Sequence, residues 1–182
     1  MKPLFTIHAG ELVAGDYIER KFRRVNVWVP AKDTGVDLLV SDAQNKKLVS
    51  LQVKFSRDFL ATHMAAVFQK PLRACGWWSL NLRKIAASPA DYWVFVVVGF
   101  ARRSTDFVII KPAELLERLR AIHGSAKTVQ SYLWVTEKSR CWETRGLRRH
   151  EQVSVAHGQF RNDDRDFTAY LNNWEPLKQL NH

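Results

Sequence analysis

The chain has 182 residues, of which 46% are hydrophobic and 25% charged, a composition that excludes a disordered chain, and no apolar run is long enough to span a bilayer. The formal charge of +10 favours a polyanionic partner, because neutralised phosphates release condensed counterions, although charge can also serve solubility alone. Cys75 and Cys141 lack metal-ligand spacing, which argues against a zinc site or a disulfide framework and predicts two reduced, packed thiols.

The first predicted element is a helix over residues 8–23, HAGELVAGDYIERKFR. The N-terminal stretch MKPLFTIHAGELVAG has no uninterrupted apolar core followed by a small-residue cleavage site, so a secretory signal is not expected and a cytoplasmic protein is. On a helical wheel Glu11 falls in the middle of the apolar face, whereas Asp16 and Glu19 fall on the polar face. An acid aimed at the core is costly unless something pairs with it, which makes Glu11 a candidate functional residue.

Three short strands are predicted next, in RRVNVWVP, VDLLVSD and KLVSLQVKF, and the short connections KDTG and DAQNKK favour an antiparallel meander. Asp37 begins the second of these strands. In the third, Gln52 and Lys54 face away from the alternating apolar residues Val49, Leu51, Val53 and Phe55.

Residues 57–90 are ambiguous. RDFLATHMAAVF is compatible with helix or loop, GWWSLN with an aromatic turn-like segment, and LRKIAAS with a short helix before Pro89. Trp77 and Trp78 could form a dimer contact or a wall of a substrate cleft. His63 is a conceivable general base, although a lone histidine is more often structural or exposed.

The second half begins with two apolar strands, DYWVFVVVGF, which is expected to be buried on both faces, and TDFVIIKP. A helix from Pro112 to a stop at Gly124 and a hairpin through QSYLWVTEK and CWETRG complete a domain predicted to cover residues 1–156. Residues 157–182 form a polar segment with a short helix in FTAYLNNWEPL, expected to pack on the same domain. Its acids are more typical of a helix start than of a metal site; they are Asp163, Asp164 and Asp166.

The predicted order has a core-facing acid, Glu11, in the first helix, Asp37 at the start of the second strand, and Gln52 and Lys54 near the end of the third. Together Glu11, Asp37 and Gln52 offer two carboxylates and an amide oxygen. Such hard oxygen ligands suit Mg²⁺ and leave positions for water and a phosphate oxygen. Lys54, on the same strand face as Gln52, could orient a water or stabilise the added charge on phosphorus.

This order of residues resembles the PD-(D/E)XK nuclease superfamily, through GELVAGDYIERKF, DTGVDLLV and LQVKF. The similarity is greatest to compact Holliday-junction-resolvase-like and homing-endonuclease-like members. The resemblance implies an α/β (α+β) fold with a mixed β-sheet flanked by helices, in the order α-β-β-β-α-β with extra C-terminal strands and a helix. It also implies dependence on Mg²⁺ or Mn²⁺ and hydrolysis of phosphodiester bonds.

The resemblance assigns roles residue by residue. Glu11 and Asp37 would be metal ligands, the main-chain carbonyl of Val53 a further ligand, and Lys54 the catalytic lysine. Gln52 stands where the family usually has Asp or Glu, and a neutral amide brings no charge, so weaker metal binding is expected.

Two basic clusters are candidates for phosphate contact: Arg20, Lys21, Arg23 and Arg24, and Arg145, Arg148, Arg149 and His150. The alternatives are a helix C-terminus that favours cations and a solvated loop. The resulting hypothesis is a metal-dependent endonuclease acting on DNA, for which the resemblance implies that a homodimer could cut both strands. The alternative is a catalytically inactive relative that binds nucleic acid within a repair or defence assembly. A membrane surface is the least favoured partner, because the basic residues are interleaved with aromatic ones.

Overall fold

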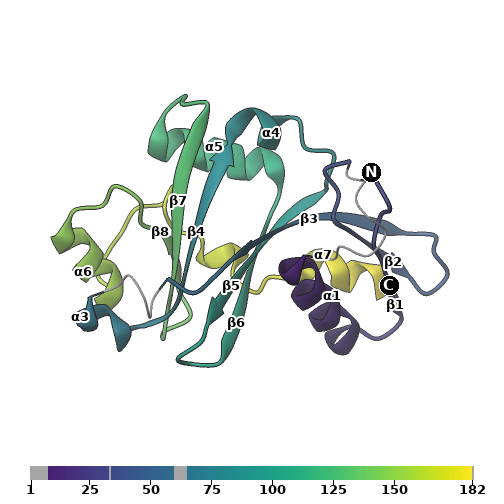
Figure 1. Cartoon of the computed structure of the whole chain (residues 1–182), viewed down its shortest axis with the longest axis horizontal. Coiled ribbons are helices and arrows are strands. Elements are labelled where there is room, and N and C mark those ends of the chain that lie inside the picture. The colour runs from purple at the N-terminus through teal and green to yellow at the C-terminus, as the bar shows by residue number, and fades with distance from the viewer. Residues whose placement is uncertain (1–7, 33, 60–64, 182) are drawn as a thin grey trace.

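The computed structural model describes residues 8–32, 34–59 and 65–181, and it has the mixed α/β architecture expected from the sequence (Figure 1). The strands are β1 (Val25–Trp28), β2 (Leu38–Asp42), β3 (Leu48–Ser56), β4 (Leu72–Asn81), β5 (Tyr92–Gly99), β6 (Ser104–Ile110), β7 (Thr128–Thr136) and β8 (Cys141–Glu143). The helices are α1 (Ala9–Lys21), α3 (Ala66–Gln69), α4 (Leu82–Ala86), α5 (Pro112–His123), α6 (Arg149–His157) and α7 (Glu175–Lys178), with 3₁₀ turns at Thr168–Tyr170 and Gln179–Asn181. Across these ranges no helix is long and apolar enough to cross a membrane.

The strands form two sheets. The first has the order β1-β2-β3-β5-β6, in which β3 and β5 are parallel and the other neighbours antiparallel. The second is antiparallel, in the order β4-β7-β8. The predicted meander is therefore confirmed as β1 to β3, and the predicted late hairpin is confirmed as β7 and β8.

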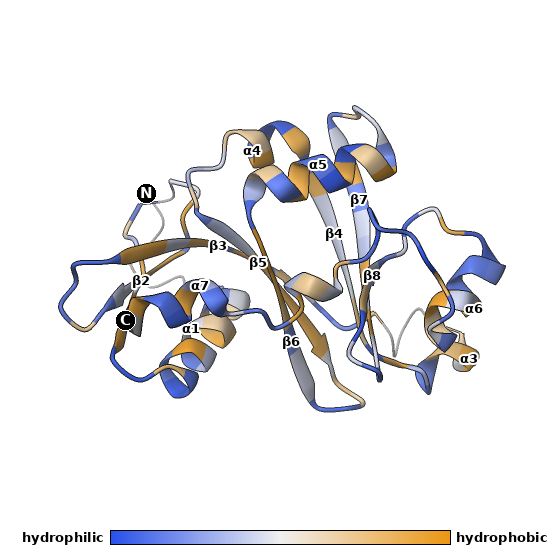
Figure 2. Cartoon of the chain, turned by 180° about the vertical axis from the view of Figure 1, so that it is seen from behind, coloured by the Kyte–Doolittle hydropathy of each residue, from blue (hydrophilic) through white to orange (hydrophobic). Residues whose placement is uncertain are grey.

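Strand β5 lies between two hydrophobic cores, which confirms the prediction that it is buried on both faces. Trp93, Phe95 and Val97 pack in a core that also contains side chains of β4, α4, α5 and β7. Val94 and Val96 pack in a second core with α1, β2, β3 and the C-terminal residues Trp174 and Leu177 (yellow in Figure 1). Viewed from behind, the hydrophobic residues concentrate on the central strands and the hydrophilic ones on the connecting loops (Figure 2).

The segment between β3 and β5 differs from the predictions in part. GWWSLN is not a turn but the end of β4, because Trp78 and Leu80 point into the core while Trp77 and Ser79 lie on the opposite face. The predicted short helix in LRKIAAS is confirmed as α4. In RDFLATHMAAVF the structure has the short helix α3, and His63 lies outside the described residues. The expected order α-β-β-β-α-β is thus interrupted by β4, which belongs to the second sheet.

The C-terminal segment also differs in detail. Helix α6 was not predicted, and the expected helix in FTAYLNNWEPL is instead a 3₁₀ turn and α7. Asn172 separates them with a φ of 53°, and its side-chain oxygen accepts a 2.8 Å hydrogen bond from the Phe107 amide. Asp166 precedes the 3₁₀ turn and accepts a hydrogen bond from the Thr168 amide, which fits the predicted role of an acid at a helix start. The division at residues 156 and 157 stays a prediction.

The two cysteines are buried and free, as predicted. Desolvation by burial raises the pKa of the Cys75 thiol, and the neighbouring charge of Asp58 raises it further. Burial likewise raises the pKa of Cys141, with Asp106 as the largest charge contribution. Because the thiolate is the reactive form, both are packing residues rather than nucleophiles.

Candidate active site

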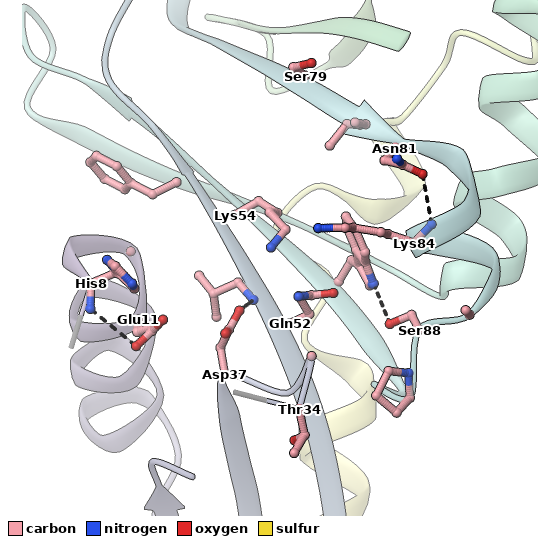
Figure 3. A pocket seen from close by; sticks show the side chains of 18 of the residues that line it. His8, Glu11, Thr34, Asp37, Gln52, Lys54, Ser79, Asn81, Lys84 and Ser88 are labelled. Atoms are coloured by element: carbon pink, nitrogen blue, oxygen red, sulfur yellow. Dashed lines mark hydrogen bonds between the residues drawn. The ribbon is translucent and has the colours of Figure 1, made fainter. Parts of the chain in front are cut away.

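A cleft of about 1090 Å³ opens between the N-terminal end of α1, strand β3 and the connection from β4 to α4. The predicted catalytic and metal-binding residues Glu11, Asp37, Gln52, Val53 and Lys54 all line it (Figure 3). They come from α1, from β3 and from the residue directly before β2, with more than forty residues of chain between the first and the last. The structure therefore brings the whole predicted set into one cavity.

Asp37 is fixed against β3 by its own backbone and by its side chain. Its amide donates to the Leu51 carbonyl at 2.8 Å, and its Oδ2 accepts from the Val53 amide at 2.8 Å. The residue is buried. Because the donor is a main-chain amide of β3, which also carries Gln52 and Lys54, the Asp37 carboxylate is fixed relative to both of these side chains.

Glu11 lies in the first turn of α1 and is only 4% exposed, which confirms that it faces inward despite its charge. Its Oε2 accepts a hydrogen bond from the His8 amide at 3.3 Å. The free amides and the positive end of the helix dipole offset part of the cost of burying this carboxylate.

Gly10 allows α1 to approach β3 closely. A Cβ at this position would lie 2.6 Å from the Cβ of Phe55 and 3.3 Å from Cγ1 of Val53. Since Phe55 Cβ is bonded directly to the backbone, it cannot rotate away. The glycine before Glu11 therefore sets how near the carboxylate stands to the strand.

Gln52 and Lys54 project from β3 on the same side, as the alternation of the strand predicts, and both are half-buried (Figure 3). The Lys54 Nζ lies 5.1 Å from the centroid of the Trp93 ring. Trp93 is itself held by a 2.9 Å hydrogen bond from its indole nitrogen to Ser88 Oγ. The aromatic face thus supports the ammonium group on the floor of the cleft.

Lys84 is a cleft residue that the sequence analysis missed. It belongs to α4, whose N-cap Asn81 accepts hydrogen bonds from the amides of Arg83 and Lys84 at 3.0 and 3.2 Å. Its side chain extends into the cleft toward Lys54 and Gln52 (Figure 3). The cavity therefore has carboxylates on the side of α1 and β2, and amines on the side of β3 and α4.

The donor set in the cleft suits a hard cation. It offers two carboxylates, an amide oxygen and the main-chain carbonyl of Val53, the oxygen ligands that Mg²⁺ and Mn²⁺ accept. No three His, Cys, Asp or Glu side chains gather at a metal-binding distance in the part of the chain that the structure describes. An ion here would therefore depend on Gln52, on Val53 and on ligands from water or substrate.

The predicted basic clusters lie outside this cleft. Arg20 is exposed in the last turn of α1, about 14 Å along the helix axis from Glu11, and pairs with Asp16 at 2.9 Å. Arg23 and Arg24 are exposed in the turn that follows the helix. Arg145 and Arg149 line a second hollow of about 380 Å³, and Arg148 is the N-cap of α6. The structure thus separates the candidate chemistry from both clusters.

Comparison with protein-family models, curated proteins and solved structures finds no match to this chain. The functional conclusion therefore follows from the geometry of the cleft.

Proposed function

We propose that this protein is a cytoplasmic, Mg²⁺- or Mn²⁺-dependent endonuclease that hydrolyses phosphodiester bonds in DNA. The observation that carries the proposal is the convergence of Glu11, Asp37, Gln52 and Lys54 on one cleft. The resemblance to PD-(D/E)XK nucleases implies a mixed sheet flanked by helices. The arrangement of α1, the antiparallel strands β1 to β3 and the strand β5 parallel to β3 fits it.

Each residue of the cleft has a distinct task in this proposal. Glu11 and Asp37 would hold the ion with Gln52 and the Val53 carbonyl, and the hydrogen bond from the Val53 amide keeps the Asp37 carboxylate oriented. When bound, the ion would supply Lewis-acid polarisation of the phosphate and a water of lowered pKa. Lys54 positions the attacking water or stabilises the charge that develops on phosphorus.

Lys84 contributes a second positive charge on the phosphate side of the cleft. A phosphodiester that enters the cleft would be attracted to the positive charges of both Lys84 and Lys54. The positive wall would therefore draw the backbone of the substrate toward Lys54, opposite the carboxylates.

The test compares wild type with Lys54→Ala on plasmid, single-stranded and branched DNA, with Mg²⁺, Mn²⁺ or a chelator. Lys47→Ala is the matched control, because it removes the same charge from the exposed turn before β3. Cleavage should require the metal, disappear in Lys54→Ala and persist in Lys47→Ala. Equal cleavage by both variants would contradict the proposal.

A second candidate is a catalytically inactive nucleic-acid-binding subunit of a repair or defence assembly. It is favoured by Gln52 in the place of a carboxylate, since the site then has one negative charge fewer to hold the ion. In that case the same experiment would give salt-sensitive binding that survives both chelation and Lys54→Ala, without cleavage by any form.

A further inference from the structure

One face of the second sheet is only partly covered and leads directly from the cleft to the second hollow. Three pairs of residues follow one another along β4 and β7 on this face: Cys75 with Trp134, Trp77 with Tyr132, and Ser79 with Gln130. The first pair is buried under α3 and α6, the second pair is half-buried, and the third pair is exposed. Ser79 also lines the catalytic cleft.

The half-covered part of this face is aromatic. The Trp77 ring lies 6.0 Å from Phe59 and 6.4 Å from Tyr132, measured between ring centroids. We call Phe59, Trp77 and Tyr132 the aromatic shelf. Trp77 is two residues from Ser79 along β4, so the shelf begins about 7 Å from the cleft wall.

Arginines accompany these rings. The guanidinium of Arg57 lies 5.4 Å from the Phe59 centroid, and that of Arg145 lies 5.8 Å from Tyr132. Arg149 stacks 4.4 Å over Phe68 at the edge of the same hollow. Each of these cations is thus held beside a flat apolar surface.

The carboxylates near these arginines are buried or bound within the protein. Asp58, between Arg57 and Phe59, is 3% exposed and accepts a 2.8 Å hydrogen bond from the Phe100 amide. Among the described residues that line the hollow, none is acidic. The nearby Glu143 is fully buried and bound to Arg165 at 2.8 Å, and Glu151 accepts a hydrogen bond from the Arg148 amide at 2.7 Å. The side chains that line the hollow therefore offer an anionic, aromatic ligand positive charge and no carboxylate.

Unpaired nucleotides have this combination of properties. Their bases expose flat π-faces that stack on aromatic side chains, and their phosphates pair with arginine. In a duplex the bases are stacked on each other, so their faces cannot contact the protein. We propose that the aromatic shelf, with Arg57, Arg145 and Arg149, binds single-stranded DNA that continues into the cleft. The inference rests on the proposed nuclease function and narrows its substrate to DNA with an unpaired segment beside the cleaved bond.

The test measures binding without cleavage, in a chelator, by fluorescence anisotropy of a blunt duplex and of the same duplex with an unpaired tail. Wild type should bind the tailed duplex about tenfold more tightly, the size expected for stacking of one base. Tyr132→Leu should remove most of this preference, whereas Tyr132→Phe, which keeps the ring, should retain it. Arg149→Ala should weaken binding of the tailed duplex more than of the blunt one.

Arg120→Ala is the control, because it removes the same charge from an exposed position on α5. An equal effect of Arg149→Ala and Arg120→Ala on both ligands, or equal binding of both by wild type, would overturn the inference. A preference confined to an RNA tail would overturn the assignment to DNA.

Cleavage separates the two proposals. Lys54-dependent cleavage of blunt and tailed duplexes at the same rate would leave the nuclease standing and refute the shelf. A tail preference that depends on Tyr132, with no cleavage under any condition, would keep the shelf and refute the nuclease.

Discussion

Substitution of Gly10 by alanine tests whether the docking of α1 on β3 sets the geometry of the cleft. The added Cβ would lie 2.6 Å from Phe55 Cβ, and ordinary contact begins at 3.4 Å, so helix and strand must separate by about 0.8 Å. Overpacking of this kind costs about 1–3 kcal/mol, and alanine returns about 1 kcal/mol in helix propensity. The free energy of unfolding should therefore fall by about 0–2 kcal/mol, while the displaced Glu11 should lower the cleavage rate about 100-fold.

Gly15→Ala is the matched control in the same helix. Its Cβ would meet Val27 Cγ1 at 3.7 Å, which is ordinary contact, so only the gain in helix propensity remains. Single-turnover cleavage and thermal unfolding of both variants give the readouts, with about 2–4 °C expected per kcal/mol for a chain of this length. Wild-type cleavage by Gly10→Ala, or an equal loss of cleavage in both variants, would refute this account of the cleft.

Three further predictions concern the site, the fold and the thiols. Gln52→Glu adds a negative charge beside a divalent ion, worth about 2–8 kcal/mol at 4 Å between the dielectric constants of water and of a protein surface. Calorimetry should therefore show tighter Mn²⁺ binding, and unchanged affinity would place Gln52 outside the ligand set. Arg73→Ala removes the side chain that donates two hydrogen bonds to the buried carboxylate of Asp106. The free energy of unfolding, measured in urea, should fall by about 3 kcal/mol. The Arg73→Ala, Asp106→Ala double variant should regain part of this loss. Cys75 and Cys141 should react with a thiol reagent in the native protein far more slowly than after denaturation, because burial raises their pKa; rapid native labelling would contradict it.

The site residues that could be predicted are those whose orientation follows from the repeat of a single helix or strand. Glu11 stood out because a helical wheel places an acid on an apolar face, and the structure buries it there. Gln52 and Lys54 were assigned to one face by the alternation of a strand, and both line the cleft. These inferences need only the geometry of a single element.

Lys84 and the aromatic shelf could not be found in this way. Lys84 reaches the cleft only because β5 pairs parallel with β3, which folds the intervening segment back over the strand, and no local pattern specifies that pairing. In β4 the adjacent Trp77 and Trp78 hide the alternation, since an aromatic residue stands on each face. The pairing of Trp77 with Tyr132 joins segments that are far apart in the chain.

The double burial of β5 has a consequence for how the molecule loses its structure. Its alternate side chains belong to two different cores, so neither the part around α1 nor the part around the second sheet can open without exposing one side of this strand. The two halves should therefore melt together in a single cooperative transition. The walls of the cleft, which come from both halves, would then persist or disappear as one unit.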